Sequence, residues 1–168
     1  MKPLFLRLTT CSLALLTSLS VFAENPAPNG GNITDLKQIL AETPHNVINA
    51  LRNGATRDNA ATQASDLLRT KVQGREATLT FKIDLIEKET RGQNDTGYRV
   101  RAEEKHVSEV GTNLITYLWV HFDVSENAKV SALKKGAEIT TTGKITQASI
   151  SSKPNPALHV DLSDAKLK

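Results

Sequence analysis

The sequence predicts an α+β protein in which short N-terminal helices precede a five-stranded β-barrel. Two observations lead to this prediction. Before residue 75 the apolar residues recur with helical spacing, whereas from Ala77 they alternate with polar residues, as in strands that bury one face. In addition, the long predicted strand over residues 137–150 contains Gly143, and a glycine within a strand is a common site for the bend that a small barrel requires.

The first 23 residues have the layout of a secretory signal peptide. Lys2 and Arg7 precede the apolar run CSLALLTSLSVF, and Ala23 provides a small residue at the expected cleavage site. The run is shorter than the roughly 20 residues that a membrane-spanning helix needs. We expect cleavage after Ala23 and an exported chain, periplasmic or secreted, with no transmembrane segment after the signal is removed.

Composition narrows the possible functions of the mature chain. Cys11 is the only cysteine and lies within the signal, so the mature chain is expected to lack thiols, disulfides and thiolate metal sites. The whole chain has a formal charge of +3, but removal of the signal leaves 19 basic and 18 acidic residues, a charge of +1. This near-neutral balance weakens the argument from bulk charge for a nucleic-acid or anionic-membrane partner.

Helical signals occupy the segment before the strands. Thr34 is predicted to cap a helix over residues 35–42, Thr43 followed by Pro44 to begin a second, and Thr56 to open a third. The third helix has an apolar stripe and is expected to end at Gly74. The predicted organisation is a signal peptide (1–23), a flexible tether (24–32), a helical segment (33–74) and the barrel (75–168).

The barrel strands follow in order. They are expected at residues 77–86, 98–107, 114–123, 137–150 and 158–165. A polar loop is predicted over residues 89–97, a single helical turn containing Val130 and Leu133 is predicted to plug one end of the barrel, and residues 151–156 form the last loop.

The last two strands carry a resemblance to a known fold. The stretch ALKKGAEITTTGKITQASI followed by ALHVDLSDAKL resembles the end of an OB-fold, in the manner of bacterial exported tRNA-anticodon-binding-like domains. The matching residues are Leu133, Gly136, Gly143, Ile145 and the alternation Leu158-Val160-Leu162. The resemblance implies a module that binds oligonucleotides, oligosaccharides or proteins across strands two and three and the loops at 89–97 and 151–156.

The third predicted strand supplies the candidate ligand-binding residues. If its even-numbered residues point inward, then Tyr117, Trp119 and His121 share the outer face, because side chains alternate along a strand. Arg99 and Arg101 of strand two are expected beside them, and Lys153 in the last loop is a further candidate. Two interpretations stand: the aromatic strip is covered by the N-terminal helices, which its nearly continuous apolar character favours, or it is a platform for a ligand.

No catalytic residue, metal ligand or cofactor is predicted. His159, Asp161 and Ser163 share one strand face, but neighbours are about 6.6 Å apart along the backbone, too far for a catalytic relay. Glu87 and Glu89 are interpreted as strand-end solvation. The sequence therefore favours non-enzymatic binding of an envelope protein or oligomeric ligand, with single-stranded nucleic-acid binding as the alternative and a carboxylate- or histidine-based hydrolase as a third hypothesis.

Overall fold

The computed structural model describes residues 30–91, 95–109 and 112–168, so the predicted signal peptide and most of the predicted tether lie outside the described residues. Within these ranges, no helix is both long enough and apolar enough to cross a membrane. In chain order the elements are α1 (Leu36–Ala41), α2 (His45–Ala50), α3 (Arg57–Lys71), β1 (Glu76–Arg91), β2 (Asp95–Ala102), β3 (Lys105–Glu109), β4 (Thr112–Phe122), η1 (Val124–Glu126), α4 (Asn127–Ser131), β5 (Glu138–Ser151) and β6 (Ala157–Leu167).

The strands form one sheet in the order β2-β1-β5-β6-β4-β3, and β2 also pairs with β4. In the series β2-β1-β5-β6-β4, each strand therefore has a hydrogen-bonded neighbour on both sides. The pairing of β4 with β6 is parallel, and the other strand pairings are antiparallel. This connectivity confirms an OB-like α+β fold, in which β2 and β4 take the places of strands two and three.

Two predicted segments differ from the structure. The second predicted strand is divided at Glu103 and Glu104 into β2 and β3, and β3 forms a hairpin with β4. The predicted loop over residues 89–97 is wrong over most of its length, because Glu89 pairs with Gly97 and Thr90 pairs with Thr96 in the β1–β2 ladder. Backbone hydrogen bonds hold this hairpin end, so it needs no apolar alternation, which is the signal that the sequence prediction relied on.

The predicted helix caps are also partly wrong. Asp35, rather than Thr34, caps α1, because its carboxylate accepts a hydrogen bond from the Lys37 backbone nitrogen at 2.9 Å. The hydroxyl of Thr43 is buried and has no hydrogen-bond partner among the described residues. Thr56 is the N-cap residue of α3, as predicted, but its hydroxyl donates to the Ala50 carbonyl at 2.9 Å and does not bond to the helix.

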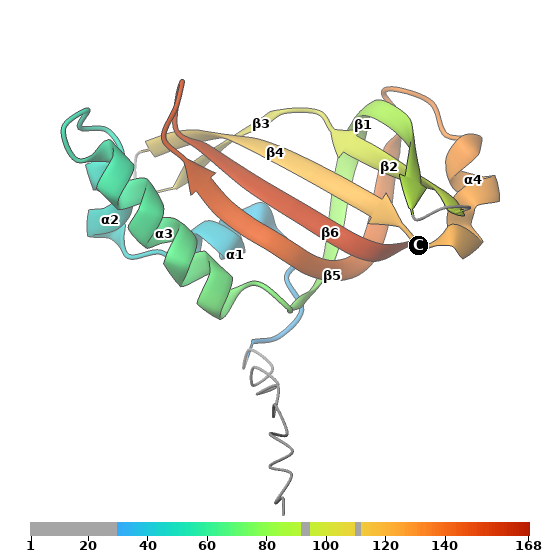
Figure 1. Cartoon of the computed structure of the whole chain (residues 1–168), viewed down its shortest axis with the longest axis horizontal. Helices are drawn as coiled ribbons and strands as arrows, with labels where there is room; N and C mark the ends of the chain where they lie inside the picture. Colours follow the sequence, from blue (N-terminus) through green and yellow to red (C-terminus); the bar gives the residue numbers. More distant parts are fainter. Residues whose placement is uncertain (1–29, 92–94, 110–111) are drawn as a thin grey trace, which may run out of the picture.

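A single hydrophobic core joins the helices to the sheet. Leu68 and Val72 at the end of α3 belong to the same buried cluster as Phe81 and Leu118 of the sheet. The helix α3 packs on β5, and α1 packs on β3. Figure 1 shows α1, α2 and α3 together at one end of the sheet and α4 at the other end, where Val130 is fully buried. The predicted helical turn is present, but it contains Val130 and not Leu133.

Two glycines shape the segment that leads into and forms β5: Gly136 at the turn before the strand and Gly143 within it. A Cβ atom at Gly143 would lie 2.9 Å from the Ser163 carbonyl oxygen, and the β5–β6 register shifts between Thr142 and Lys144. The predicted irregularity at Gly143 is therefore confirmed. Gly136 has a φ of 84°, which side-chain-bearing residues rarely adopt, and its nitrogen donates to the Ile83 carbonyl at 2.7 Å as the chain turns into β5.

Candidate ligand-binding face

The outer side of β4 carries a row of ring side chains. Leu118, Val120 and Phe122 are buried, whereas Tyr117, Trp119 and His121 alternate with them and are partly exposed. The predicted alternation of this strand is thus confirmed. We use the term aromatic face for the surface made by these three residues and the partners that surround them, which are Arg99, Arg101, His159 and Asp161.

Strand β2 places two guanidinium groups on Trp119. Because Arg101 pairs with Trp119 and Arg99 pairs with His121 in the ladder, the arginine side chains lie on the same side of the sheet as the rings. The guanidinium carbons are 4.4 Å (Arg99) and 5.7 Å (Arg101) from the centre of the Trp119 ring. These cation–π contacts hold the indole in place and cover part of its surface.

Strand β1 supplies a row of carboxylates behind the arginines. Glu87 accepts a hydrogen bond from Arg99 Nε at 2.8 Å, and Asp84 accepts one from Arg101 Nε at 3.0 Å. A carboxylate oxygen of Glu89 lies 2.9 Å from Nδ1 of His121. The interpretation of Glu87 and Glu89 as strand-end solvation is therefore wrong, because both side chains fix residues of the aromatic face.

Strand β6 completes the face through its parallel pairing with β4. Tyr117 pairs with His159, and the two rings stack with centroids 5.2 Å apart and an angle of 24° between their planes. The His159 Nε2 atom lies 2.9 Å from the Ser151 hydroxyl at the end of β5. Asp161 pairs with Trp119 in the same ladder, so a carboxylate lies on the far side of the indole from β2.

Burial perturbs two titratable side chains of β6. It lowers the pKa of His159 below its usual value, and the neighbouring Asp161 charge opposes this effect. Burial raises the pKa of Asp161, against the opposing influence of His121, His159 and Arg99. The face is therefore a partly desolvated surface on which charges are expensive unless they are paired.

The N-terminal helices α1 and α3 pack elsewhere on the sheet. The α3 packing is on β5 and the α1 packing is on β3, whereas the partners found for Tyr117, Trp119 and His121 come from β1, β2 and β6. Side-chain exposure agrees, since 40% of the Arg99 side chain and 25% of the His121 side chain are exposed. The described N-terminal helices therefore do not cover this face, contrary to the interpretation that they bury the aromatic strip.

Lys153, the sixth candidate residue, interacts with a helix and not with the aromatic face. It is exposed in the β5–β6 loop, and its amine lies 3.3 Å from the Asp58 carboxylate in the first turn of α3. Hydrogen bonds from Ser152 and Lys153 lower the pKa of Asp58. The structure therefore brings five of the six candidate residues into one face and pairs the sixth with a helix.

Sequence reasoning missed the carboxylates and the β6 residues of this face. The alternation in ALHVDLSDA places His159 and Asp161 on one side of a strand, but their contact with β4 depends on a parallel pairing between strands far apart in the chain. Among the described residues, no group of three or more His, Cys, Asp or Glu side chains is arranged to hold a metal ion.

The fold and the face together define an OB-like α+β protein with an aromatic and arginine-bearing surface on β2 and β4. No family model matches the chain, and no curated protein matches it. One similar solved structure is a Klebsiella pneumoniae lipoprotein to which nucleic-acid binding is provisionally ascribed, with 16% identity and a TM-score of 0.45 over 82% of this chain and 92% of that chain.

A second similar structure is the Plasmodium falciparum SSB in complex with ssDNA. It shares 15% identity with a TM-score of 0.36, over 58% of this chain and 94% of that chain. Because both TM-scores are below 0.5, neither likeness bears on what this chain binds.

Proposed function

We propose that this chain is an exported, non-enzymatic binding protein whose closed run of five strands is an OB-type barrel and whose aromatic face docks a partner protein of the cell envelope. The observation that carries the proposal is the pre-organised cluster of Trp119, Tyr117, Arg99 and Arg101, on a part of the sheet that α1 and α3 do not cover. Tryptophan, tyrosine and arginine are the residues that most often dominate the binding energy of protein interfaces.

Rigidity supports the same assignment. Each long side chain of the cluster is held by a partner on a neighbouring strand: Arg99 by Glu87, Arg101 by Asp84 and Tyr117 by His159. Side chains that are already fixed lose less conformational entropy when a partner binds. The arrangement therefore favours recognition of a partner surface of fixed shape.

Charge pairing favours a protein over a polyphosphate. A phosphate group that approached Arg99 or Arg101 would have to compete with the Glu87 or Asp84 carboxylate for the same guanidinium. Asp161 and Glu89 add further acidic groups beside the rings. A protein partner that contributes apolar and cationic side chains has no such competition to overcome.

Single-stranded nucleic acid is the second candidate, because the aromatic rings lie on β4 and the arginines on β2, the two strands with which OB-folds commonly hold oligonucleotides. The test is the fluorescence of Trp119, the only tryptophan, during titration with an oligothymidylate of about 16 nucleotides. Quenching that weakens steeply with salt would establish this candidate, since each phosphate contact contributes a slope of about −0.7 in log affinity against log salt.

The partner itself is tested by site-specific photo-crosslinking in the host envelope. A photoreactive residue at position 117 should form an adduct with one discrete protein, whereas the same residue at Thr62, exposed on α3, should not. Arg99→Ala should abolish the adduct, and Arg69→Ala, which removes an exposed arginine paired with Asp66 on α3, should leave it unchanged. Equal adducts at both positions, or none at position 117, would contradict the proposal.

A further inference from the structure

A second concave site lies on the opposite side of β4 from the aromatic face. It is a pocket of about 300 Å³ between α1 and the inward-facing side chains of β1 and β4. Its volume is at the lower end of the range for small-molecule sites and corresponds to roughly ten heavy atoms. Its apolar lining residues are Leu36, Leu79, Phe81, Ala102 and Leu118.

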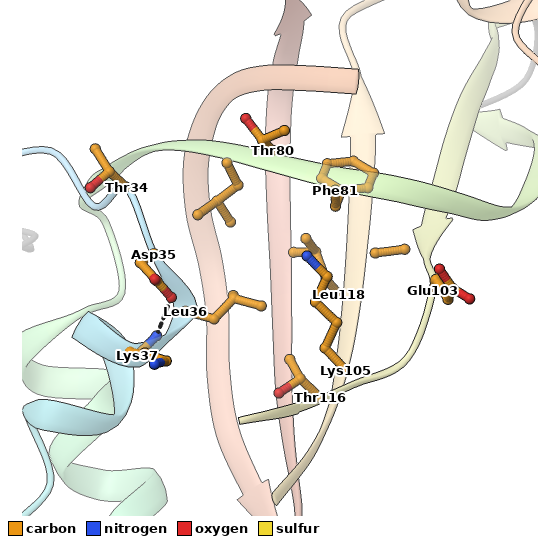
Figure 2. Close-up of a pocket in the computed structure, with 12 residues that line it drawn as sticks. Thr34, Asp35, Leu36, Lys37, Thr80, Phe81, Glu103, Lys105, Thr116 and Leu118 are labelled. Carbon is orange, nitrogen blue, oxygen red and sulfur yellow. Dashed lines mark hydrogen bonds between the residues drawn. The ribbon is translucent and has the colours of Figure 1, made fainter. Parts of the chain in front are cut away.

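Lys105 and Thr116, two residues with hydrogen-bond donors, are cross-strand neighbours on this lining. Lys105 pairs directly with Thr116 in the β3–β4 ladder, so their side chains project from the same side of the sheet. Among the described residues, the Thr116 hydroxyl is buried without a hydrogen-bond partner, whereas the Lys105 side chain is exposed. Figure 2 shows the Lys105 amine directed from β3 toward Leu118 and Phe81.

The acidic residues of the pocket lie at its edges. Figure 2 shows Asp35 and Glu103 on opposite sides of Lys105. The Asp35 carboxylate already accepts a hydrogen bond from the Lys37 backbone nitrogen at 2.9 Å, as the N-cap of α1. The middle of the pocket therefore combines an apolar surface with an ammonium group and an unsatisfied hydroxyl.

We infer that this pocket binds a small amphipathic monocarboxylate, with the carboxylate bound by Lys105 and Thr116 and the hydrocarbon tail against the apolar residues Leu36 and Leu79. The ligand carboxylate accepts hydrogen bonds from the Lys105 ammonium and from the Thr116 hydroxyl, which has no hydrogen-bond partner within residues 30–91, 95–109 and 112–168. The tail replaces water over the apolar lining. This inference is independent of the aromatic face, so the two proposals succeed or fail separately.

The test uses octanoate, which has about ten heavy atoms, with octylamine and octanol as ligands that differ in the head group. Isothermal titration of the mature chain should give a saturable dissociation constant on the order of 0.1–1 mM for octanoate. Lys105→Gln should weaken binding about tenfold, and Thr116→Val should weaken it several-fold without loss of stability, because it removes an unpaired buried hydroxyl.

Matched controls are available on β5. Thr141→Val removes another buried and unpaired hydroxyl, and Lys144→Gln removes another exposed lysine, and neither residue lines the pocket. Both should change octanoate affinity less than about twofold. Methyl NMR of the unmodified chain should show octanoate-dependent shifts at Leu36, Leu79 and Leu118. Absence of these shifts, equal binding of octylamine, or unaltered affinity in both pocket variants would overturn the inference.

Discussion

His159 and Asp161, two residues apart on β6, respond to burial in opposite directions. Burial lowers the pKa of the imidazole and raises the pKa of the carboxyl group. In each case the folded protein favours the neutral form relative to the unfolded chain. The two residues therefore make contributions of opposite sign to the dependence of stability on pH.

Protonation of His159 is predicted to destabilise the fold. Because its folded pKa lies below the usual 6.5, the unfolded chain binds the proton first as pH falls, and the free energy of unfolding decreases below about pH 6.5. His159→Gln should flatten this decline between about pH 7 and pH 5 in urea unfolding. An NMR titration that places the His159 pKa at or above 6.5, or an unchanged slope in the variant, would contradict this.

The Asp161 contribution has the opposite sign. Its raised pKa means that the charged form destabilises the fold at neutral pH and that this effect is relieved as pH falls through the raised value toward 3.8. Asp161→Asn should therefore be more stable than the parent chain at pH 7, and the difference should close in acid. Loss of the Asp161 charge should also lower the pKa of His159 further, which the same NMR titration measures.

One hydroxyl group adds a hydrogen bond to the apolar contact between α3 and β5. Ser65 Oγ accepts a hydrogen bond from the Ile150 backbone nitrogen at 2.9 Å and lies 2.8 Å from the Ala61 carbonyl oxygen of its own helix. Thr62, one turn earlier, bonds only to the Asp58 carbonyl among the hydrogen bonds found in the described residues. Replacing Ser65 by alanine therefore removes a bond to β5 and a bond within the helix, whereas replacing Thr62 removes only a bond within the helix.

Ser65→Ala should lower the free energy of unfolding by about 1–3 kcal/mol, because the partly buried Ile150 nitrogen loses an acceptor. Thr62→Ala should change stability by less than about 0.5 kcal/mol, as expected for an exposed site. Urea unfolding monitored by circular dichroism measures both changes. Equal effects of the two substitutions would show that this bond does not hold α3 on β5.

At position 143 of β5 there is no room for a side chain, whereas at position 54 there is. A Cβ atom at position 143 would approach the Ser163 carbonyl oxygen to 2.9 Å, whereas a Cβ atom at Gly54 would meet nothing within 4 Å. Gly143→Ala should therefore destabilise the fold by about 1–3 kcal/mol through overpacking. Gly54→Ala should be close to neutral in the same thermal unfolding assay, and a neutral Gly143→Ala would contradict the packing account of the β5–β6 irregularity.

The helices and the sheet form one cooperative unit, because their apolar residues belong to a single buried cluster. Leu68 is fully buried in that cluster, whereas the adjacent Leu67 is partly exposed. Leu68→Ala should cost about 2–5 kcal/mol and Leu67→Ala clearly less. Far-ultraviolet circular dichroism and Trp119 fluorescence should report the same transition, and separate transitions would show that the helical segment folds independently of the sheet.

The sequence predicted what local patterns encode and missed what long-range pairing decides. The change of apolar spacing at Ala77, the irregularity at Gly143 and the outward alternation of Tyr117, Trp119 and His121 were all available locally. In the sequence the carboxylates Asp84, Glu87 and Glu89 look like ordinary strand polarity. The fold places Asp84 and Glu87 against arginines of β2 and Glu89 against His121 of β4. Similarly, the stacking of Tyr117 on His159 follows from a parallel pairing that no local pattern specifies.

The central claim is that the aromatic face is an open surface on which two arginines hold Trp119. Acrylamide quenching of Trp119 fluorescence tests this claim most directly. The unmodified chain should show partial quenching of Trp119 fluorescence, Arg99→Ala should increase the quenching, and the control Arg69→Ala should not. A blue-shifted emission that acrylamide does not quench, and that Arg99→Ala does not change, would contradict the claim, because Trp119 would then belong to the core.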